Sequence, residues 1–357
     1  MQDTVSLIIP TYNEKENIKP LVERIHQALS GYHYEIVIVD DNSTDGTIDI
    51  TNELAASYPI KLLVRRNEKG LSTAVIHGIK NSTGKYICVM DADLQHPPEI
   101  LPALFKAVEN GADIAFASRY VPGGGCPQWG LVRRIISKGA TKVAHALLPS
   151  SRRVNDPMSG FFIFKRENVD PDKLSPVGYK IALEILLMGD FKNVAEVPFI
   201  FEDRTAGKSK LKAKTQIDYL KHVFSLMRRT GEYKRLGKFI TVGLSGVVVN
   251  ELVLLLVKVF TAWNQYVRQI PGIEASIITN FLFNDIFTFA DRRSGKASSF
   301  WGRLLRFYLV ALAGAVIQWG ISTLLMNQGM NDYLALFIAI VISFIWNYFL
   351  STIWAWR

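Results

Sequence analysis

The sequence predicts an α/β fold with a mostly parallel sheet, followed by a membrane-embedded helical domain. Short runs rich in β-branched residues alternate with helix-like segments through the first 200 residues. After residue 238 the chain becomes strongly apolar over stretches of about 20 residues, the length that crosses a bilayer core. Strand and helix alternation with apolar strands is typical of a parallel sheet covered by helices on both faces.

Seven strands are expected, at residues 5–10, 35–40, 61–65, 86–90, 113–118, 161–164 and 194–201. Helical patterns lie between the early strands, at residues 14–30, 44–58, 70–82 and 97–110. Ser43 or Thr44 is the expected cap of the second helix, because a hydroxyl there can accept a bond from a free backbone N–H. In such sheets the ligand site lies outside the carboxyl ends of the strands.

Polar side chains follow four of these strands, at residues 11–14, 40–43, 91–95 and 119. Asp91 and Asp93 are the most informative, because carboxylates one residue apart on an extended chain point to the same side. Oxygen ligands suit Mg²⁺ or Mn²⁺, and these ions usually also hold substrate phosphates. An isolated Asp-x-Asp pair has an alternative explanation as an ordinary polar strand exit. The convergence of four strand ends favours a nucleotide diphosphate site.

Two further sets of residues fit a nucleotide and its phosphates. Asp41 is expected to accept hydrogen bonds from a base or ribose, although a cap and turn explain residues 43–46 as well. Guanidinium forks and ammonium groups bind phosphates. The candidates are Arg119, Arg133, Arg134, Lys180, Arg204, Lys208 and Lys210. A solvated basic face beside anionic lipid is the alternative for each of them.

Charge and cysteine content narrow the class of protein. Eleven Lys or Arg and two acids lie between residues 204 and 238, directly before the apolar spans, which indicates a membrane-surface collar rather than a nucleic-acid patch. The two cysteines, Cys88 and Cys126, make neither a disulfide framework nor a metal cluster. A strand is expected from about residue 5, which leaves no room for a secretory signal, so the soluble part is expected on the cytoplasmic side.

The C-terminal third is expected to be an integral membrane domain of four spans, at residues 239–260, 269–289, 305–326 and 333–355. Asn280, Asn284 and Asp285 interrupt the second span. The positive-inside rule places both termini and the loop between spans two and three in the cytoplasm, because Lys and Arg concentrate in that loop. The preceding segment has apolar residues at near-helical spacing and is expected to lie in the headgroup layer, or alternatively to pack on the catalytic domain as a solvated helix.

Several segments resemble the family 2 inverting glycosyltransferases, namely residues 9–14 (Ile-Pro-Thr-Tyr-Asn-Glu), 39–47, 91–99 (Asp-Ala-Asp-Leu-Gln-His-Pro-Pro-Glu) and 118–120. Within that family, residues 156–162 and 203–211 resemble dolichyl-phosphate mannose synthases and related polyprenyl-phosphate glycosyltransferases. The resemblance covers residues 4–230. The tail resembles the four-span GtrA-like membrane domain, at residues 239–246, 280–281 and 347–349.

The resemblance implies a GT-A type, Rossmann-like catalytic domain over residues 1–207, amphipathic interface helices over 208–236 and a four-helix transmembrane domain over 237–357. It implies metal-dependent, inverting transfer of mannose from GDP-mannose to dolichyl or polyprenyl phosphate at the cytoplasmic membrane face. The alternatives are a UDP-glucose-dependent polyprenyl-phosphate glucosyltransferase, and a transport or scaffold protein for lipid-linked sugar. The Gln-x-x-Arg-Trp motif of processive polysaccharide synthases is missing from the sequence.

The resemblance also implies roles for individual residues. The donor would be bound by Pro10, Tyr12, Glu14, Val39, Asp41, Asp91, Ala92, Asp93, Gln95, Lys180 and Lys210, and Mg²⁺ or Mn²⁺ by Asp91, Asp93 and Gln95. The acceptor phosphate would be held by Arg119, Arg133, Ser137 and Arg204, and the catalytic groups would be Asp91, Asp93, Arg119 and Arg204. Residues 156–178 would form a mobile acceptor loop. A phosphate acceptor is already an anion at pH 7, so no general base is expected.

Overall fold

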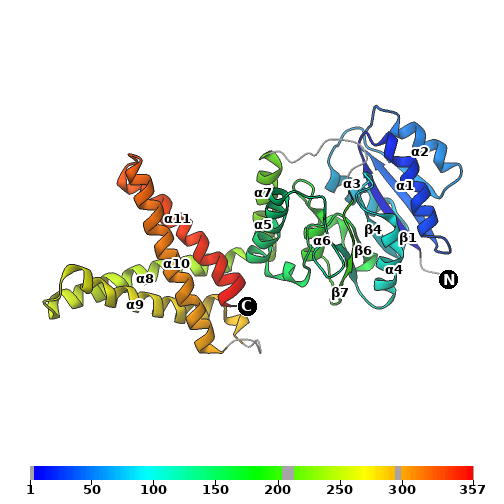
Figure 1. Cartoon of the computed structure of the whole chain (residues 1–357). Helices are drawn as coiled ribbons and strands as arrows, with labels where there is room; N and C mark the ends of the chain where they lie inside the picture. The colour runs from blue at the N-terminus through cyan, green and yellow to red at the C-terminus, as the bar shows by residue number, and fades with distance from the viewer. Residues whose placement is uncertain (1–3, 203–212, 294–298, 357) are drawn as a thin grey trace. The chain divides into compact units, whose positions relative to one another are not determined.

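The structure is a computed structural model that describes residues 4–202, 213–293 and 299–356. The chain forms two compact units, Met1–Leu226 and Met227–Arg357. Each unit is described by itself below (Figure 1).

The first unit is built on a seven-stranded sheet with the strand order β3-β2-β1-β4-β6-β5-β7. The strands are β1 Val5–Thr11, β2 Tyr34–Asp40, β3 Ile60–Val64, β4 Tyr86–Val89, β5 Ile114–Ser118, β6 Phe162–Lys165 and β7 Val194–Pro198. Only β6 runs antiparallel to its neighbours, β4 and β5. The expected mostly parallel α/β sheet is therefore confirmed. The reversed β6 brings the residues before it to the same edge as the carboxyl ends of the other strands.

Seven α-helices accompany this sheet among the described residues. They are α1 Lys15–Ala28, α2 Thr47–Ala55, α3 Leu71–Asn81, α4 Leu101–Glu109, α5 Leu131–Leu147, α6 Ile181–Met188 and α7 Ala213–Thr230. Short 3₁₀ turns lie at Pro98–Ile100, Pro149–Arg153, Arg166–Asn168 and Pro171–Lys173. The first four helices lie where the sequence predicts them, and α5 and α6 are additional.

The expected cap of α2 is wrong. The helix begins at Thr47, and Asp45 Oδ1 accepts a hydrogen bond from the Thr47 N–H at 3.0 Å. The Ser43 hydroxyl instead donates to Asp40 at 2.7 Å. Side chains at turns have several backbone and side-chain partners within reach, and residue spacing does not choose between them.

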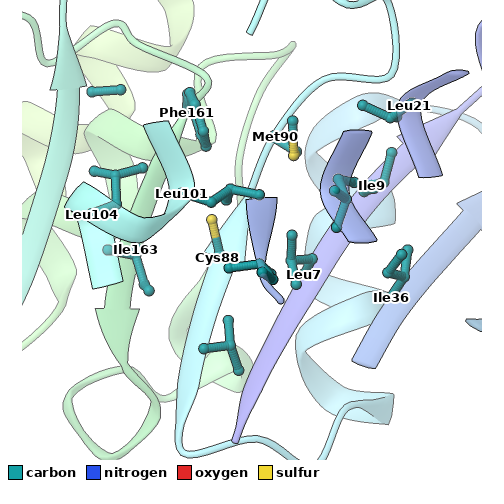
Figure 2. Close-up of a cluster of buried hydrophobic side chains, with 14 of the residues drawn as sticks. Leu7, Ile9, Leu21, Ile36, Cys88, Met90, Leu101, Leu104, Phe161 and Ile163 are labelled. Atoms are coloured by element: carbon teal, nitrogen blue, oxygen red, sulfur yellow. The ribbon is translucent and has the colours of Figure 1, made fainter. Parts of the chain in front are cut away.

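Two apolar layers cover the sheet, one on each face. Leu7 and Ile9 of β1 lie in the layer with α1 and α4, where Leu21 and Leu104 are also buried (Figure 2). Ile8 points to the other layer, since successive strand residues face opposite sides. Helix α3 approaches that side so closely that a Cβ at Gly78 would lie 2.5 Å from Ile8 Cγ2. These two layers fix the positions of the strand ends relative to one another.

The second unit contains α8 Tyr233–Phe260, α9 Gln265–Phe283, α10 Phe300–Asn327 and α11 Asp332–Leu350. Two π-helical turns follow α9 and α11, η5 Asn284–Thr288 and η7 Ser351–Ala355. Three helical segments among the described residues are long and apolar enough to cross a membrane, namely Tyr233–Phe260, Phe300–Asn327 and Asp332–Ala355. Large apolar side chains are exposed along them, for example Leu244, Leu255 and Val316.

The helices of the second unit form two copies of one hairpin, which the sequence analysis missed. Figure 1 shows α8 beside α9 and α10 beside α11. A shift of 68 residues aligns 235–248 with 303–316 and gives seven identical pairs, at 235/303, 236/304, 239/307, 242/310, 244/312, 246/314 and 248/316. A shift of 67 residues aligns Asn280 with Asn347, and η5 with η7. We name these copies the first hairpin (233–289) and the second hairpin (300–356).

Equivalent residues make equivalent contacts inside the two hairpins. A Cβ on Gly246 would lie 2.4 Å from the Asn280 side chain, and a Cβ on Gly314 would lie 2.4 Å from the Asn347 side chain. In each hairpin a glycine therefore admits the asparagine of the facing helix. Small residues allow such close approach between membrane helices.

The two hairpins also contact each other reciprocally. Phe239 meets Tyr348 with ring centroids 5.2 Å apart, and the equivalent pair Phe307 and Phe281 lies at 5.9 Å. Phe289 and its equivalent Trp356 stack on each other at 4.5 Å. Reciprocal contacts of this kind define a two-fold interface. The second unit thus has an internal pseudo-two-fold axis that passes near the Phe289–Trp356 stack.

A buried carboxylate joins three strands in the first unit, and its removal should destabilise the fold. Asp113 accepts hydrogen bonds from the Asn193 N–H at 2.8 Å, the Lys192 N–H at 2.9 Å and Lys165 Nζ at 2.8 Å. The Asn193 backbone bond and the Lys165 bond lower the pKa of Asp113 to about 2. We expect Asp113→Asn to lower the free energy of unfolding by about 2 kcal/mol at pH 7.

The pH dependence of this difference has a definite sign. The folded pKa lies below the unfolded value of about 3.9, so the contribution is present above about pH 4 and disappears as the pH falls toward 2. Unfolding of the full chain in detergent, followed at several pH values, measures it. Glu109→Gln, at the exposed end of α4, is the control. A pH-independent difference between Asp113→Asn and the wild type would contradict the assignment.

Candidate active site

The loops after β1 and β2 form one end of the candidate site. Asp40 is fully buried and accepts hydrogen bonds from Thr11 Oγ1 at 2.8 Å and from Ser43 Oγ at 2.7 Å. Its carboxylate therefore holds the two loops together. Asn13 and Asn42 take positive φ angles of 58° and 59° in these loops, a conformation that asparagine tolerates better than most residues.

Asp41 lies in a closed network next to Asp40. Its Oδ1 accepts hydrogen bonds from Arg65 Nε at 2.8 Å and from Arg65 Nη2, and its Oδ2 accepts one from the Gly70 N–H at 2.7 Å. The sequence reasoning expected a nucleotide contact for Asp41 and missed Arg65. The position of Arg65 at the carboxyl end of the expected third strand was the available signal. Any nucleotide contact of Asp41 therefore uses a carboxylate whose orientation Arg65 already determines.

The other expected base and ribose residues lie at the same loops. Pro10 and Val39 are paired in the β1–β2 register, and Val39 is buried. Glu14 lies just before α1, and its Oε2 accepts a hydrogen bond from Asn17 Nδ2 at 2.7 Å. Tyr12 is 42% exposed, with Lys69 Nζ 4.4 Å from its ring centre. Tyr12 and Lys69 thus present an aromatic face and a cation to solvent, and the sequence reasoning missed Lys69.

The segment that contains Asp91 and Asp93 forms a tight turn after β4. Asp93 Oδ1 accepts a hydrogen bond from the Gln95 N–H at 3.2 Å, and Leu94 between them has a φ of 61°. Gln95 Nε2 donates to the Glu202 carbonyl at 3.2 Å, so the amide oxygen lies on the opposite branch of the side chain. Ala92 is buried. The turn thus places the oxygen-bearing side chains of 91, 93 and 95 on one short stretch of chain.

His96 positions this turn, a role that the sequence reasoning did not assign. The Asp91 N–H donates to His96 Nδ1 at 3.1 Å, and the ring stacks on Phe161 at 5.3 Å. Burial lowers the pKa of His96 to about 4, so the imidazole is neutral at physiological pH. Because Nδ1 accepts a bond, the ring proton is assigned to Nε2. A neutral ring leaves the charge of the Asp91 and Asp93 carboxylates uncancelled.

The donor set of this turn fits a hard divalent cation. Gly160 makes room for Asp91, because a Cβ there would lie 3.2 Å from Asp91 Oδ2. Across the described ranges, no three His, Cys, Asp or Glu side chains converge into a complete metal cage. Mg²⁺ is usually bound by one or two carboxylates together with substrate phosphates rather than by an all-protein cage. Asp91, Asp93 and Gln95 match that chemistry.

Arg119 makes a buried ion pair at the other end of the site. Its Nε donates to Asp156 Oδ2 at 2.7 Å and its Nη2 donates to Asp156 Oδ1 at 2.8 Å. Arg119 follows β5 and Asp156 precedes β6, so the antiparallel strand makes this pair possible. The sequence reasoning gave Arg119 to an acceptor phosphate and did not foresee that its fork also binds the Asp156 carboxylate. The sequence analysis included Asp156 only as part of the segment 156–162 and gave it no role of its own.

Aromatic rings surround the Arg119 guanidinium. Trp129 lies 5.1 Å from it and Phe201 lies 5.5 Å from it. Arg133 covers the Trp129 ring at 4.1 Å. The Tyr120 hydroxyl donates to Ser137 Oγ at 2.8 Å. The three expected acceptor residues within the described chain, Arg119, Arg133 and Ser137, therefore belong to one cluster with Tyr120 and Trp129.

Lys180 lies between the two ends of the site. Its Nζ donates to the Met158 carbonyl at 3.2 Å, and its charge interacts with Arg119, Asp156 and Asp91. Burial of the ammonium, followed by the repulsion of Arg119, lowers the pKa of Lys180 to about 8. Lys180 therefore carries a positive charge at pH 7 that a rise of one to two pH units removes.

The structure corrects the expected acceptor loop and does not describe three of the expected basic residues. Residues 162–165 of the expected acceptor loop form strand β6 in the middle of the sheet, so the idea of a mobile loop over the whole of 156–178 is wrong. Apolar residues such as Phe162 and Phe164 are buried there, in agreement with the strand expected at residues 161–164. The expected phosphate ligands Arg204 and Lys210, together with Lys208, lie outside the described residues.

Comparison with known proteins matches both halves of the chain. Residues 6–170 match Glycosyl transferase family 2, and residues 238–356 match the GtrA/DPMS transmembrane domain. A dolichol-phosphate mannosyltransferase from Pyrococcus furiosus is 48% identical over 340 residues, which covers 95% of this chain and 96% of that protein. A dolichol-phosphate mannosyltransferase from Saccharomyces cerevisiae is 42% identical, over 62% of this chain and 86% of that protein.

A solved structure of glucosyl-3-phosphoglycerate synthase from Mycobacterium tuberculosis is 20% identical, with a TM-score of 0.49, over 64% of this chain and 80% of that one. The Pyrococcus furiosus relative matches almost from end to end, and the two matched domains follow each other along this chain. The chain therefore belongs to the dolichol-phosphate mannosyltransferase family of family 2 glycosyltransferases and carries that family's GtrA/DPMS transmembrane domain.

Proposed function

We propose that this glycosyltransferase transfers mannose from GDP-mannose to dolichyl or polyprenyl phosphate, with inversion at the anomeric carbon. The product is a dolichyl phosphate mannose that serves glycosylation. The observation that carries the proposal is the order of charges along one sheet edge. The carboxylates of Asp91 and Asp93 and the amide oxygen of Gln95 are followed by the cation of Lys180 and then by the Arg119 cluster. Such an order suits a metal-bound diphosphate next to a second phosphate.

The donor would extend along the edge from β2 to β4. Tyr12, Glu14, Pro10, Val39 and Asp41 would contact its base and ribose. Asp91, Asp93 and Gln95 would hold Mg²⁺ or Mn²⁺, which when bound would neutralise charge on the departing diphosphate. Lys180 would add a positive charge beside the same phosphates, and Lys210 is proposed for the same task. Ala92 would contact the ribose.

The acceptor phosphate would lie at the Arg119 cluster. Its anionic oxygen would attack the anomeric carbon while the bond from that carbon to the donor phosphate breaks, and GDP would leave. Arg119, Arg133, Ser137 and Arg204 would position the phosphate. Because Asp156 takes the fork of Arg119, that guanidinium would offer a shared charge rather than a full clamp. A guanidinium charge shared in this way would position the acceptor phosphate and leave its oxygen reactive.

The lipid chain of the acceptor has an apolar surface beside this cluster. Leu131, Val132, Ile135 and Ile136 on one face of α5 are between 43% and 73% exposed, next to Arg133 and Ser137. Helix α7 packs against α5, where the Tyr219 hydroxyl donates to the Ala140 carbonyl at 2.6 Å. Ile217, Leu220 and Phe224 of α7 are exposed as well. Apolar side chains on basic helices suit the headgroup layer of a membrane.

We also propose four spans, with the catalytic domain (1–207) on the cytoplasmic side, interface helices over 208–236 and the membrane domain over 237–357. Helix α9 is the span that composition alone does not support. It aligns with α11, which is long and apolar enough to cross. Its place in the repeat therefore supports α9 as the second span of the first hairpin. The basic loop between α9 and α10 supports the orientation.

A donor and acceptor panel tests the proposed function. Full-length protein in membranes is given GDP-mannose or UDP-glucose, each with dolichyl phosphate, and the labelled lipid product is measured. We expect product from GDP-mannose at a rate at least tenfold above that from UDP-glucose. Faster transfer from UDP-glucose would assign the chain to glucosyl transfer. Transfer from neither donor would refute the enzymatic proposal.

Replacement of Asp93 tests the metal assignment. Asp93→Asn preserves the size of the side chain and an acceptor for the Gln95 N–H, but it removes a charge. We expect the transfer rate to fall by at least about 100-fold, because a metal ligand that neutralises the leaving group is lost. Rates are measured over a range of Mn²⁺ concentrations. Asp49→Asn, exposed on α2, is the control, and a wild-type rate in Asp93→Asn at limiting Mn²⁺ would refute the assignment.

The pKa of Lys180 predicts an alkaline limit for activity. Since that pKa is about 8, the cation is lost as the pH rises above 8, and kcat/KM should fall with it. Lys180→Arg retains its charge at high pH, so its alkaline limb should move upward by more than one pH unit. Lys180→Met should lose activity at every pH. An alkaline limb that is identical in the wild type and in an active Lys180→Arg would show that another group sets it.

A further inference from the structure

A polar cavity of about 280 Å³ lies at the start of α8, entirely within the second unit. Its charged lining residues are Glu232, Lys234, Arg235, Lys238 and Asp291. Lys234 and Lys238 are exposed at its surface. Three cations and two carboxylates leave the lining with a net positive charge. We call this cavity the α8 pocket.

The two carboxylates of the α8 pocket are used to hold one cation. Arg235 Nη2 donates to Asp291 Oδ2 at 2.8 Å, and Arg235 Nη1 lies 3.3 Å from Glu232 Oε2. Lys238 Nζ donates to the Phe287 carbonyl at 3.1 Å, a neutral partner. The positive charge of Lys234 and Lys238 is therefore the charge that the lining leaves uncompensated.

A buried hydroxyl in the lining points to a ligand. Thr288 is 3% exposed, it lines the α8 pocket, and its Oγ1 has no hydrogen-bond partner among the described residues. Buried polar groups are normally paired, because an unmade hydrogen bond costs free energy.

The internal repeat shows how the two halves differ at this position. Asp285 of the first hairpin accepts hydrogen bonds from Arg303 of the second, at 2.8 and 3.1 Å. The reciprocal pair across the pseudo-two-fold axis is Arg235 and Thr352, so the carboxylate is replaced by a hydroxyl. The cations are kept at both positions, as Arg235 with Arg303 and Lys238 with Arg306. In the half that contains the α8 pocket, Arg235 pairs instead with Glu232 and Asp291.

We propose that the α8 pocket binds the phosphate group of a membrane lipid, at a site separate from the sugar-transfer site. A phosphate offers several acceptor oxygens to Lys234, Lys238 and the Thr288 hydroxyl. Apolar side chains continue from the pocket along α8, where Ile240 is 42% and Leu244 is 63% exposed. A lipid whose phosphate occupied the pocket could lay its chains along that surface. The proposal does not depend on the proposed sugar transfer.

Two lipids share this chemistry, a polyprenyl monophosphate and a bulk anionic phospholipid. The test measures how many molecules of each bind per full-length chain in neutral detergent, with labelled polyprenyl phosphate in one arm and phosphatidylglycerol in the other. The test variant is Lys238→Met combined with Thr288→Ala. Alanine is the residue that the second hairpin has at the aligned position, Ala355, so the fold should tolerate it. Arg306→Met, at the position equivalent to Lys238, is the matched control.

We expect the double variant to bind one lipid fewer per chain, with Arg306→Met unchanged from the wild type. Loss in the polyprenyl phosphate arm identifies the carrier lipid as the ligand, and loss only in the phosphatidylglycerol arm identifies bulk lipid. Equal stoichiometry of the variant and the control in both arms would overturn the proposal. Thermal unfolding shows whether the variant is folded. Lys234→Gln, a change at an exposed residue, provides the same comparison if the double variant unfolds.

Discussion

The ion pair between Arg119 and Asp156 is the interaction on which the candidate site depends. It joins the end of β5 to the segment before β6, and both partners are buried. Removal of one partner would leave an uncompensated buried charge, which typically costs 3–5 kcal/mol. The pair also sets the electrostatics around it, because both charges act on His96 and on Lys180. The structural ion pair and the proposed phosphate site therefore share the same guanidinium.

In the catalytic unit, uncharged buried side chains lie around the acidic and the basic groups. His96 is buried against Phe161 and stays uncharged, so it orients the Asp91 turn without cancelling the carboxylates. Trp129 and Phe201 surround Arg119 and keep water from its faces. Acidic groups thus dominate one end of the edge and basic groups the other. This separation suits two phosphate-bearing substrates that must approach each other without sharing ligands.

The membrane unit is built from two equivalent helical hairpins. Each hairpin closes through a glycine that faces an asparagine, Gly246 with Asn280 and Gly314 with Asn347. The two hairpins then meet through equivalent aromatic rings. Symmetry is lost where Asp285 is matched by Thr352, and Arg235 pairs there with Glu232 and Asp291. A duplicated scaffold can acquire a binding site in this way without a change in its packing.

The sequence by itself determined the alternating strands and helices, the polar strand ends and the apolar helices, because these depend on local periodicity. It also indicated Asp91, Asp93 and Gln95, which are neighbours in the chain. Only the tertiary structure decided that β6 runs antiparallel and brings Asp156 to Arg119, that Arg65 holds Asp41, and that His96 is neutral. These features join residues between 24 and 37 positions apart or depend on burial. Strand order and side-chain packing determine these long-range contacts and the burial of each residue, and residue spacing in the sequence encodes neither the contacts nor the burial.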